Sequence, residues 1–252
     1  MSHLQTEFQT TCTPEGKPIG GESADNCYMP ENYDNKFRGP VTLRVARAQS
    51  INIPSIKTLY LAGIDDSLKT ARVMGIKSLK DKDQYGLTLV LGGGEVSLLD
   101  ITSAYGVFAN NGARNPYEKI LRIEDGKGQV FEEWAGKEEQ VILKDVALQI
   151  NDILSDNIAR TPAFGGRSAL YFPGREVAVK TGTTNDYRDA WVIGYTPSLV
   201  VGAWAGNNDN SPMEKKVAGL IIAPLWNAFM VETLLELPVE RFEKPNKNID
   251  LT

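Results

Sequence analysis

Histidine is almost absent from this 252-residue sequence, which has a single one at His3. A Ser-His-Asp triad or a histidine-based metal centre is therefore not expected. Because no other cluster of metal-ligating residues stands out, the sequence predicts neither a metal nor another cofactor. Acid–base chemistry in this protein would have to use Lys, Asp, Glu, Ser, Thr or Tyr side chains.

Long apolar runs and an excess of basic residues are also missing. No stretch approaches the roughly 20 apolar residues of a membrane-spanning helix, and the polar start from Met1 to Glu7 lacks the features of an export signal. A net charge of −5, with Lys and Arg scattered, argues against a nucleic-acid partner. The composition, 42% hydrophobic and 23% charged, is typical of a globular protein with one large domain or two small ones.

Cysteine occurs twice, at Cys12 and Cys27, in a segment rich in proline, glycine and asparagine. Two interpretations remain open. The pair can form a local disulfide, which would stabilise the protein by roughly 3 kcal/mol if unstrained, or it can be two independent thiols. An oxidising compartment favours the disulfide.

Helical signals dominate the first two thirds of the chain and return near its end. Thr42 is expected to cap a helix, Ser97 and Asp100 to form a capping box, and Asp145 to cap a later helix. The expected helices cover 43–49, 54–62, 66–74, 98–108, 145–154 and 224–234. In the second helix, the expected buried stripe is Ile56, Leu59, Tyr60 and Ala62.

Strand-like patterns fall in two places. Residues 120–123 and 130–134 flank a turn at 125–128 and predict a hairpin. Residues 177–180, 190–195 and 199–205 predict sheet strands, the last two forming an antiparallel hairpin. The run Gly92-Gly93-Gly94 lacks the spacing of a phosphate-binding loop and is interpreted as a tight turn before a helix.

These elements predict an α+β fold, with a helical half followed by an antiparallel sheet backed by a C-terminal helix. The expected organisation is an irregular lead-in at 1–40, a helical half at 41–170, sheet strands plus the last helix at 171–236, and a flexible tail at 237–252.

Two short motifs carry the chemistry: Ser50-Ile51-Asn52 at a break between helices, and Lys180-Thr181-Gly182 in a strand. Each alone is weak, but together they match two of the three motifs of penicillin-interacting serine enzymes. The surrounding sequence strengthens the match. Residues 29–40 (MPENYDNKFRGP), 48–54 (AQSINIP), 104–112 (AYGVFANNG), 179–184 (VKTGTT) and 189–197 (DAWVIGYTP) closely resemble the transpeptidase domain of bifunctional, class A penicillin-binding proteins.

This resemblance implies a penicillin-binding transpeptidase fold and a D,D-transpeptidase that cross-links peptidoglycan stem peptides through an acyl-enzyme. By motif position, Ser50 would relay a proton to the leaving group and Asn52 would hydrogen-bond the substrate backbone. Lys180 would supply positive charge for the substrate carboxylate and polarise Ser50. The substrate-binding residues would be Thr181, Gly182 and Thr183.

Two of these roles have a physical basis. Lys180 and Gly182 share one face of a strand, and a glycine there lets a substrate lie against the strand. The backbone N–H of Thr183 would be one donor of the oxyanion hole, and removing such a donor costs roughly 3–4 kcal/mol.

The third family motif, Ser-x-x-Lys, occurs nowhere in the 252 residues. Ser55-Ile56-Lys57, Ser67-Leu68-Lys69 and Ser78-Leu79-Lys80 are each one residue too short to place lysine and serine on one helix face. Since the family has this motif upstream of Ser-x-Asn, we expect a truncated chain that is inactive by itself. Upstream strands, a glycosyltransferase domain and a membrane anchor would be missing with it.

The alternative hypothesis is a non-catalytic pseudoenzyme or scaffold of the same fold that binds cell-wall peptide or a partner. A serine β-lactamase is disfavoured, because the sequences around the motifs are those of the transpeptidases. The expected partners are stem peptides and, only with the missing nucleophile segment, β-lactams. The parent protein is expected on the outer face of a bacterial cytoplasmic membrane.

Overall fold

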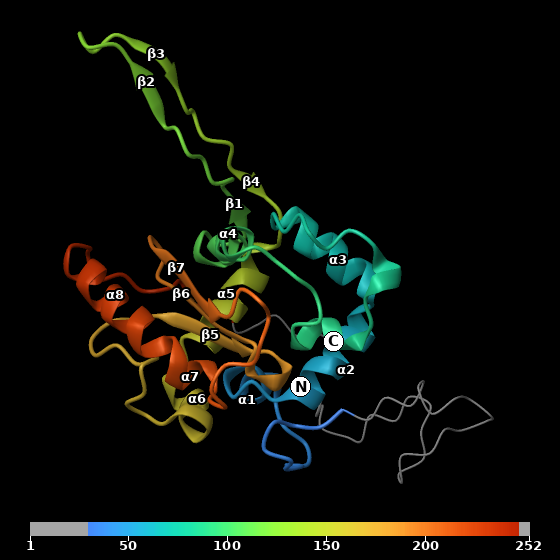
Figure 1. Ribbon diagram of the computed structural model, residues 1–252. Helices are drawn as coiled ribbons and strands as arrows, with labels where there is room; N and C mark the ends of the chain where they lie inside the picture. The colour runs from blue at the N-terminus through green and yellow to red at the C-terminus, as the bar shows by residue number, and fades with distance from the viewer. Residues whose placement is uncertain (1–29, 247–252) are drawn as a thin grey trace.

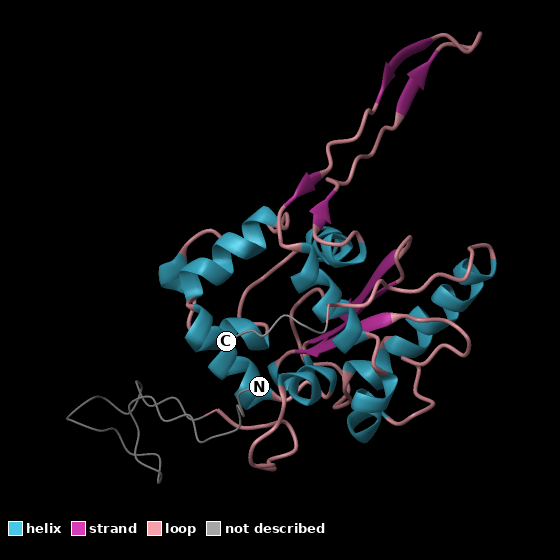
Figure 2. Cartoon of the chain, turned by 180° about the vertical axis from the view of Figure 1, so that it is seen from behind, coloured by secondary structure: helices cyan, strands magenta, loops and turns pink. Residues whose placement is uncertain are grey.

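The computed structural model describes residues 30–246. Cys12 and Cys27, and with them the expected disulfide, lie outside the described residues. Among the helices of the described part, none is long and apolar enough to cross a membrane. Figures 1 and 2 show a body of helices around a small sheet, from which one long arm projects.

The helical half begins with two helices whose junction forms part of the site. Thr42 caps the first of them by accepting a hydrogen bond from the backbone N–H of Val45, as predicted. Ser97 caps a later helix in the same way through the N–H of Asp100. The helices are α1 (Leu43–Ala48), α2 (Asn52–Ala62), α3 (Ile64–Val73), α4 (Leu98–Ala109), α5 (Lys144–Leu154) and α6 (Asn157–Phe164), with short 3-10 turns η2 (Lys82–Gln84) and η3 (Leu87–Leu91).

Two expectations for these helices are wrong, and one helix was not expected. Asp145 is not an N-cap, because α5 already begins at Lys144 and Leu143 is the cap position. In α2, Tyr60 and Ala62 are exposed, and the buried residues instead lie toward the start of the helix. The reason is that α2 packs along its first two turns on the rest of the helical half. Helix α6 was not predicted, and it contains Pro162, a residue that argues against a helix when only the sequence is considered.

The sheet has three antiparallel strands in the order β5-β6-β7. They are β5 (Ala178–Thr183), β6 (Asp189–Tyr195) and β7 (Val200–Gly206), which confirms the predicted strands and the β6–β7 hairpin. Helices α4 and α5 contact one side of this sheet, and α7 (Ala218–Ile221) and α8 (Ala223–Leu235) contact it from the other side (Figure 1). The helix plus antiparallel sheet arrangement confirms the α+β class.

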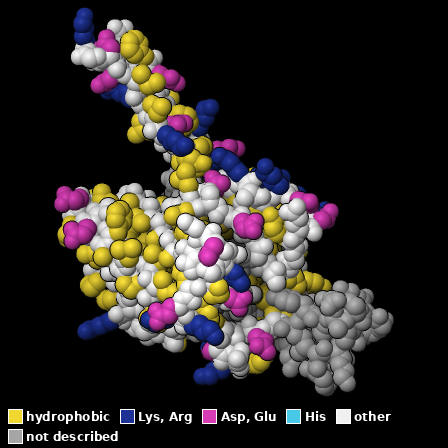
Figure 3. All heavy atoms as spheres, in the orientation of Figure 1, with side chains coloured by type: hydrophobic (Ala, Val, Ile, Leu, Met, Phe, Trp, Pro, Cys, Tyr) yellow, Lys and Arg dark blue, Asp and Glu magenta, His cyan; other side chains and the backbone are white. Residues whose placement is uncertain are grey.

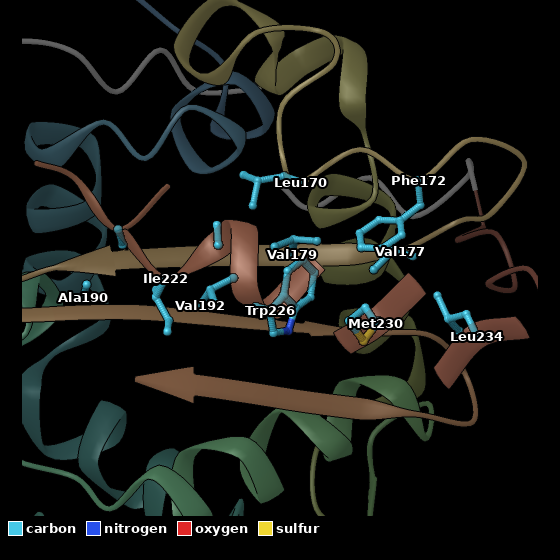
Figure 4. Close-up of a cluster of buried hydrophobic side chains, with 12 residues drawn as sticks. Leu170, Phe172, Val177, Val179, Ala190, Val192, Ile222, Trp226, Met230 and Leu234 are labelled. Carbon is cyan, nitrogen blue, oxygen red and sulfur yellow. The ribbon is translucent and has the colours of Figure 1, made fainter. Parts of the chain in front are cut away.

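The main core lies between the sheet and α8 (Figure 4). Trp226, Met230 and Leu234 from α8 are fully buried there, whereas Phe229 is exposed. Trp226 lies over Gly194 of β6, where an added Cβ would be 2.3 Å from its ring. The sheet therefore needs a glycine at that position to accept the indole.

The opposite side of the sheet is tied to the helical half by a buried polar contact. Asn151 of α5 donates to the backbone oxygen of Phe108 (2.9 Å) and accepts from the hydroxyl of Tyr195 (2.8 Å). Asn151 and Tyr195 are both completely buried. This link joins α4, α5 and β6 and sets the position of the helices on the sheet.

The predicted hairpin is confirmed and forms the outer part of the arm. Its strands are β2 (Arg122–Glu124) and β3 (Val130–Glu133), while β1 (Ala113–Arg114) pairs with β4 (Glu139–Gln140) at the base. All residues of β2 and β3 are exposed. Hydrophobic side chains are visible along the arm in Figure 3.

The segment after α8 packs against the body over its described part. Phe242 is buried, with its ring centroid 5.6 Å from that of Tyr195. Lys244 forms ion pairs with Glu176 (2.7 Å) and Asp152 (3.4 Å). Most residues of this segment are polar, which is why a flexible tail was expected, but Phe242 packs against Tyr195.

Candidate active site

Ser50 lies at the junction between α1 and α2, where the chain turns sharply. Its φ is +56°, a left-handed conformation that few non-glycine residues adopt. The turn is held by a hydrogen bond from the N–H of Ser50 to the oxygen of Arg47 (3.2 Å) and by one from Ile51 to Ala46 (2.9 Å). Strained backbone of this kind is often found at functional sites, where the surrounding structure holds it in place.

Lys180 of β5 meets Ser50 across the boundary between the sheet and the helical half. Its Nζ donates to Ser50 Oγ at 2.7 Å and to the backbone oxygen of Thr181 at 2.6 Å. Burial, and secondarily the positive charge of Arg47, lower the pKa of Lys180 to about 7. Near neutral pH this lysine can therefore both donate and accept a proton.

Asn52 opens α2, one residue past the turn at Ser50–Ile51. Its Nδ2 donates to the backbone oxygen of Glu31 (3.1 Å), so the segment before α1 lies beside it. The same segment supplies Asn32, whose Oδ1 accepts from the N–H of Ile53 (3.1 Å) and whose Nδ2 donates to the oxygen of Lys36 (2.8 Å). Asn32 is buried and caps the first turn of α2, which fixes the orientation of the Ser50–Asn52 loop.

No motif or local pattern in the sequence marks Asn32 as part of the site. The available signal was that Ile51, the residue before α2, cannot cap a helix with its side chain. The sequence thus leaves the first turn of α2 without a local side-chain cap, and spacing does not identify Asn32 as the distant one.

The outer edge of β5 carries the other predicted site residues. β5 is an end strand of the sheet among the described residues, so the edge away from β6 is unpaired there. Gly182 pairs with Trp191 on β6, and a Cβ at Gly182 would lie 3.4 Å from the Cβ of Trp191. The hydroxyl of Thr183 accepts from the N–H of Ala218 (3.0 Å), which anchors the end of the strand to α7.

The turn that follows β5 is fixed by Asp189. The hydroxyl of Thr184 donates to one carboxylate oxygen of Asp189 (2.9 Å) and accepts from its backbone N–H (2.9 Å). The other carboxylate oxygen accepts from the indole N–H of Trp204 (2.9 Å). Asp189 therefore has a structural role in holding β5, β6 and β7 together at this end.

A small cavity beside Ser50 and Lys180 is lined by one charged residue that was not among the expected site residues. Its lining includes Thr181 and the buried Arg160 of α6. Within the described residues, Arg160 Nε has no hydrogen-bond partner, and Nη2 makes only a long contact of 3.5 Å with the oxygen of Val177. Burial lowers the pKa of Arg160 to about 10. No local pattern marks a buried arginine in α6.

The structure thus brings Ser50, Lys180 and Thr181 together around one cavity, with Asn52 on the same loop as Ser50. Gly182 and Thr183 follow along the edge strand. Over the described part of the chain, no group of three or more His, Cys, Asp or Glu residues is placed to hold a metal ion. Two basic side chains, Lys180 and Arg160, line the same cavity as Ser50, which suits an anionic substrate group.

Comparison with known proteins identifies the family of this chain. A family model described as the penicillin-binding protein transpeptidase domain matches residues 20–230. Penicillin-binding protein 1A of Aquifex aeolicus is 35% identical over 241 residues, which is 95% of this chain and 32% of that protein. Penicillin-binding protein 4 of Bacillus subtilis is 30% identical over 82% of this chain and 32% of that protein. The chain therefore spans about a third of the length of these relatives.

Solved structures show the same fold. The crystal structure of penicillin-binding protein 1A from Haemophilus influenzae has a TM-score of 0.80 at 24% identity and covers 98% of this chain and 40% of that chain. PonA1 of Mycobacterium tuberculosis, in complex with penicillin V, has a TM-score of 0.76 at 24% identity, covering 88% and 64%. With most of its length matched by the family model and by 1A-type relatives, the chain belongs to the transpeptidase-domain family of class A penicillin-binding proteins.

Proposed function

We propose that this chain forms part of a peptidoglycan D,D-transpeptidase that works through a serine acyl-enzyme. The observation that carries the proposal is the 2.7 Å hydrogen bond from Lys180 Nζ to Ser50 Oγ, which joins the two family motifs at one cavity. It is supported by the family membership and by the unpaired edge of β5, along which an extended peptide can add as a strand.

The reaction has two steps. In acylation, a serine loses its proton to a neighbouring base, its oxygen attacks the carbonyl before the terminal residue of the donor peptide, an ester forms, and the amide bond to the terminal residue breaks. Ser50 gives its proton to the departing amine and takes one from the ammonium of Lys180, and the proton that the attacking serine lost restores that ammonium. In the second step an acceptor amine attacks the ester and loses one proton, a new amide forms as the ester bond breaks, and that proton returns to the serine oxygen.

The remaining residues bind the donor peptide. Asn52 donates from its side-chain amide to the peptide backbone. The positive charge of Lys180 and the hydroxyl of Thr181 bind the terminal carboxylate. The backbone N–H of Thr183 donates to the developing oxyanion, and Gly182 leaves room for the peptide to approach the strand.

The acylated serine comes from residues outside this sequence, because no Ser-x-x-Lys occurs within it. The same absence favours one second candidate function, a non-catalytic scaffold of the same fold that binds cell-wall peptide without being acylated. If the chain is part of a transpeptidase, the parent protein acts on the outer face of the cytoplasmic membrane, where the peptidoglycan substrate lies.

Intact mass measured after incubation with a penicillin tests the proposal. We expect no stable adduct on the 252-residue chain and one adduct on the full-length protein, at a serine of a Ser-x-x-Lys motif. In full-length protein, Lys180→Ala should slow acylation, whereas Lys215→Ala, at an exposed position, should not.

Two results would contradict it. An adduct on the 252-residue chain would show that its nucleophile is internal. A full-length protein that contains no Ser-x-x-Lys and yet binds a peptide ending in D-Ala-D-Ala would instead support the scaffold.

A further inference from the structure

The guanidinium of Arg160 is a buried positive charge whose hydrogen bonds are incomplete in the described part of the chain. The residue is only 4% exposed, and among the described residues its Nε has no hydrogen-bond partner. Asp156, one helical turn earlier, attracts this charge, but its carboxylate already accepts from Arg44 (3.1 Å) and from the N–H of Ala159 (2.9 Å). Because a buried charge without a partner is costly, the site around Arg160 favours an anionic group.

Two contacts fix helix α6, and with it Arg160, beside the Ser50 turn. Gln49, the residue before Ser50, donates from Nε2 to the backbone oxygen of Ala159 (3.1 Å), which ties α6 to the junction between α1 and α2. On the other side, Nη2 of Arg160 reaches the backbone oxygen of Val177, just before β5, at 3.5 Å. Helix α6 therefore holds the guanidinium between the helical half and the edge strand of the sheet.

The cavity at Arg160 has room for about one oxygen atom. Its volume is about 10 Å³, close to the least that holds one water molecule. Phe164 and Leu170 supply apolar walls, and the polar residues of the lining are Ser50, Arg160, Lys180 and Thr181. Among the described residues, no acidic side chain lines it. Three of the polar residues, Ser50, Lys180 and Thr181, are only partly buried, so a group bound along β5 can reach the cavity.

The position of this cavity along β5 identifies the part of a bound peptide that it meets. In the proposed function, the N–H of Thr183 donates to the oxyanion, and Lys180 with Thr181 binds the terminal carboxylate. The donor peptide therefore runs toward its C-terminus in the direction from Thr183 to Lys180. The cavity is lined by Val179, Lys180 and Thr181, at the carboxylate end of this path. The unpartnered Nε of Arg160 thus lies where the anionic end of the peptide arrives.

We propose that Arg160 is a specificity-determining residue that binds one oxygen of the donor peptide's terminal carboxylate in this cavity, and so makes the site selective for a free C-terminal carboxylate. The inference rests on the proposed function. The other carboxylate oxygen stays with Lys180 and Thr181, and before the peptide binds, one water molecule takes the place of the first. A C-terminal amide has a single, neutral oxygen, so it loses the charge-assisted hydrogen bond to Arg160.

Competition against a fluorescent penicillin, with full-length protein, tests this role. The competing probes are an N-acylated peptide that ends in D-Ala-D-Ala and the same peptide with a C-terminal amide. We expect the wild type to prefer the free acid. Arg160→Gln should reduce the ratio of the two affinities by at least about tenfold, the order of one hydrogen bond to a charged group. Both peptides compete with the same penicillin, so a change in the labelling rate cancels in their ratio.

Two further variants separate the charge of Arg160 from its shape and its place. Arg160→Lys keeps the positive charge but not the planar guanidinium, so we expect a ratio between those of the wild type and Arg160→Gln. Arg167→Gln, at an exposed arginine three residues past the end of α6, is the matched control and should leave the ratio unchanged. A merely structural role for Arg160 would weaken competition by both peptides equally and leave their ratio intact.

The outcomes separate this inference from the function on which it rests. Full-length protein that is not labelled by penicillin, or not protected by the free-acid peptide, overturns the proposed function and the inference together. Labelled and protected wild type that does not prefer the free acid overturns the inference and leaves the acyl-enzyme function standing. An Arg160→Gln ratio within about threefold of the wild-type ratio does the same. If Arg160→Gln is not labelled, the ratio of Arg160→Lys decides by the same criterion.

Discussion

Lys180 and Ser50, which lie 130 positions apart in the sequence, are joined by a 2.7 Å hydrogen bond from Nζ to Oγ. One residue belongs to an edge strand and the other to a left-handed turn between two helices. The bond can therefore form only when the helical half is correctly positioned on the sheet. Burial lowers the pKa of the lysine, so the same contact links the fold to proton transfer.

The lowered pKa of Lys180 predicts a pH-dependent stability. Lys180 loses its proton near pH 7 in the folded protein and near its ordinary value of 10.5 in the unfolded chain. Below pH 7 both states hold the proton, and the folded state bears the full cost of enclosing the charge. Between pH 7 and 10.5 the unfolded state binds more protons, so stability rises with pH.

Urea unfolding of the wild type and Lys180→Met between pH 6 and 9.5 checks this. We expect the free energy of unfolding of the wild type to increase with pH relative to the variant. Lys215→Met, at an exposed lysine, is the matched control. The difference in the free energy of unfolding between the wild type and Lys215→Met should not change with pH. A constant difference between wild type and Lys180→Met would mean that the lysine is not desolvated.

Removing the hydroxyl of Ser50 should slow acylation without unfolding the protein. Ser50→Ala deletes the group that receives a proton from Lys180, and such proton relays contribute about 10²–10⁴-fold to rate. Stopped-flow acylation of full-length protein by a penicillin measures the effect. Ser103→Ala on α4 is the control, and a loss of less than threefold in Ser50→Ala would remove Ser50 from the mechanism.

Gly194→Ala should destabilise the sheet. The new Cβ would lie 2.3 Å from Trp226 and 3.1 Å from the backbone oxygen of Ala178, neither of which can move freely in the core. Overpacking of this kind costs about 1–3 kcal/mol. Chemical denaturation compares it with Gly126→Ala, whose Cβ would meet nothing within 4 Å. Equal stability of the two variants would contradict the packing described here.

Tyr195→Phe should cost about 1–3 kcal/mol, although it removes a single oxygen atom. The loss leaves the Oδ1 of the completely buried Asn151 without its donor. Urea unfolding measures the change, with Tyr171→Phe at an exposed position as the control. If Tyr195→Phe were as stable as its control, the link between α5 and β6 would not contribute to the fold.

The arm should be dispensable for folding. All of β2 and β3 is exposed, and the contacts that hold the arm lie at its base, where β1 pairs with β4. Replacing residues 120–134 by a short glycine turn should change the melting temperature by less than about 2 °C. A drop of more than about 5 °C in a thermal melt would show that the outer hairpin stabilises the body.

Local signals in the sequence determined much of the secondary structure. Thr42 and Ser97 cap their helices as predicted, because an N-cap needs only its own side chain and a nearby N–H. The β6–β7 hairpin followed from two strand-like runs separated by a short turn. The family was identified from the residues around the two motifs, which are more specific than the motifs themselves.

The tertiary structure decided what no short-range pattern contains. Asn32 caps α2 from a different segment, Arg160 is buried beside Lys180, and Tyr33 reaches Tyr187 over 154 positions. Tyr60 is a further example. The helix period places Tyr60 on one face of α2, but it does not say whether another element covers that face, and in the structure Tyr60 is exposed. The sequence alone thus specified which side chains can carry the chemistry. Long-range packing of the helical half on the sheet decided which of these side chains are in contact, because contact between distant segments depends on the whole fold.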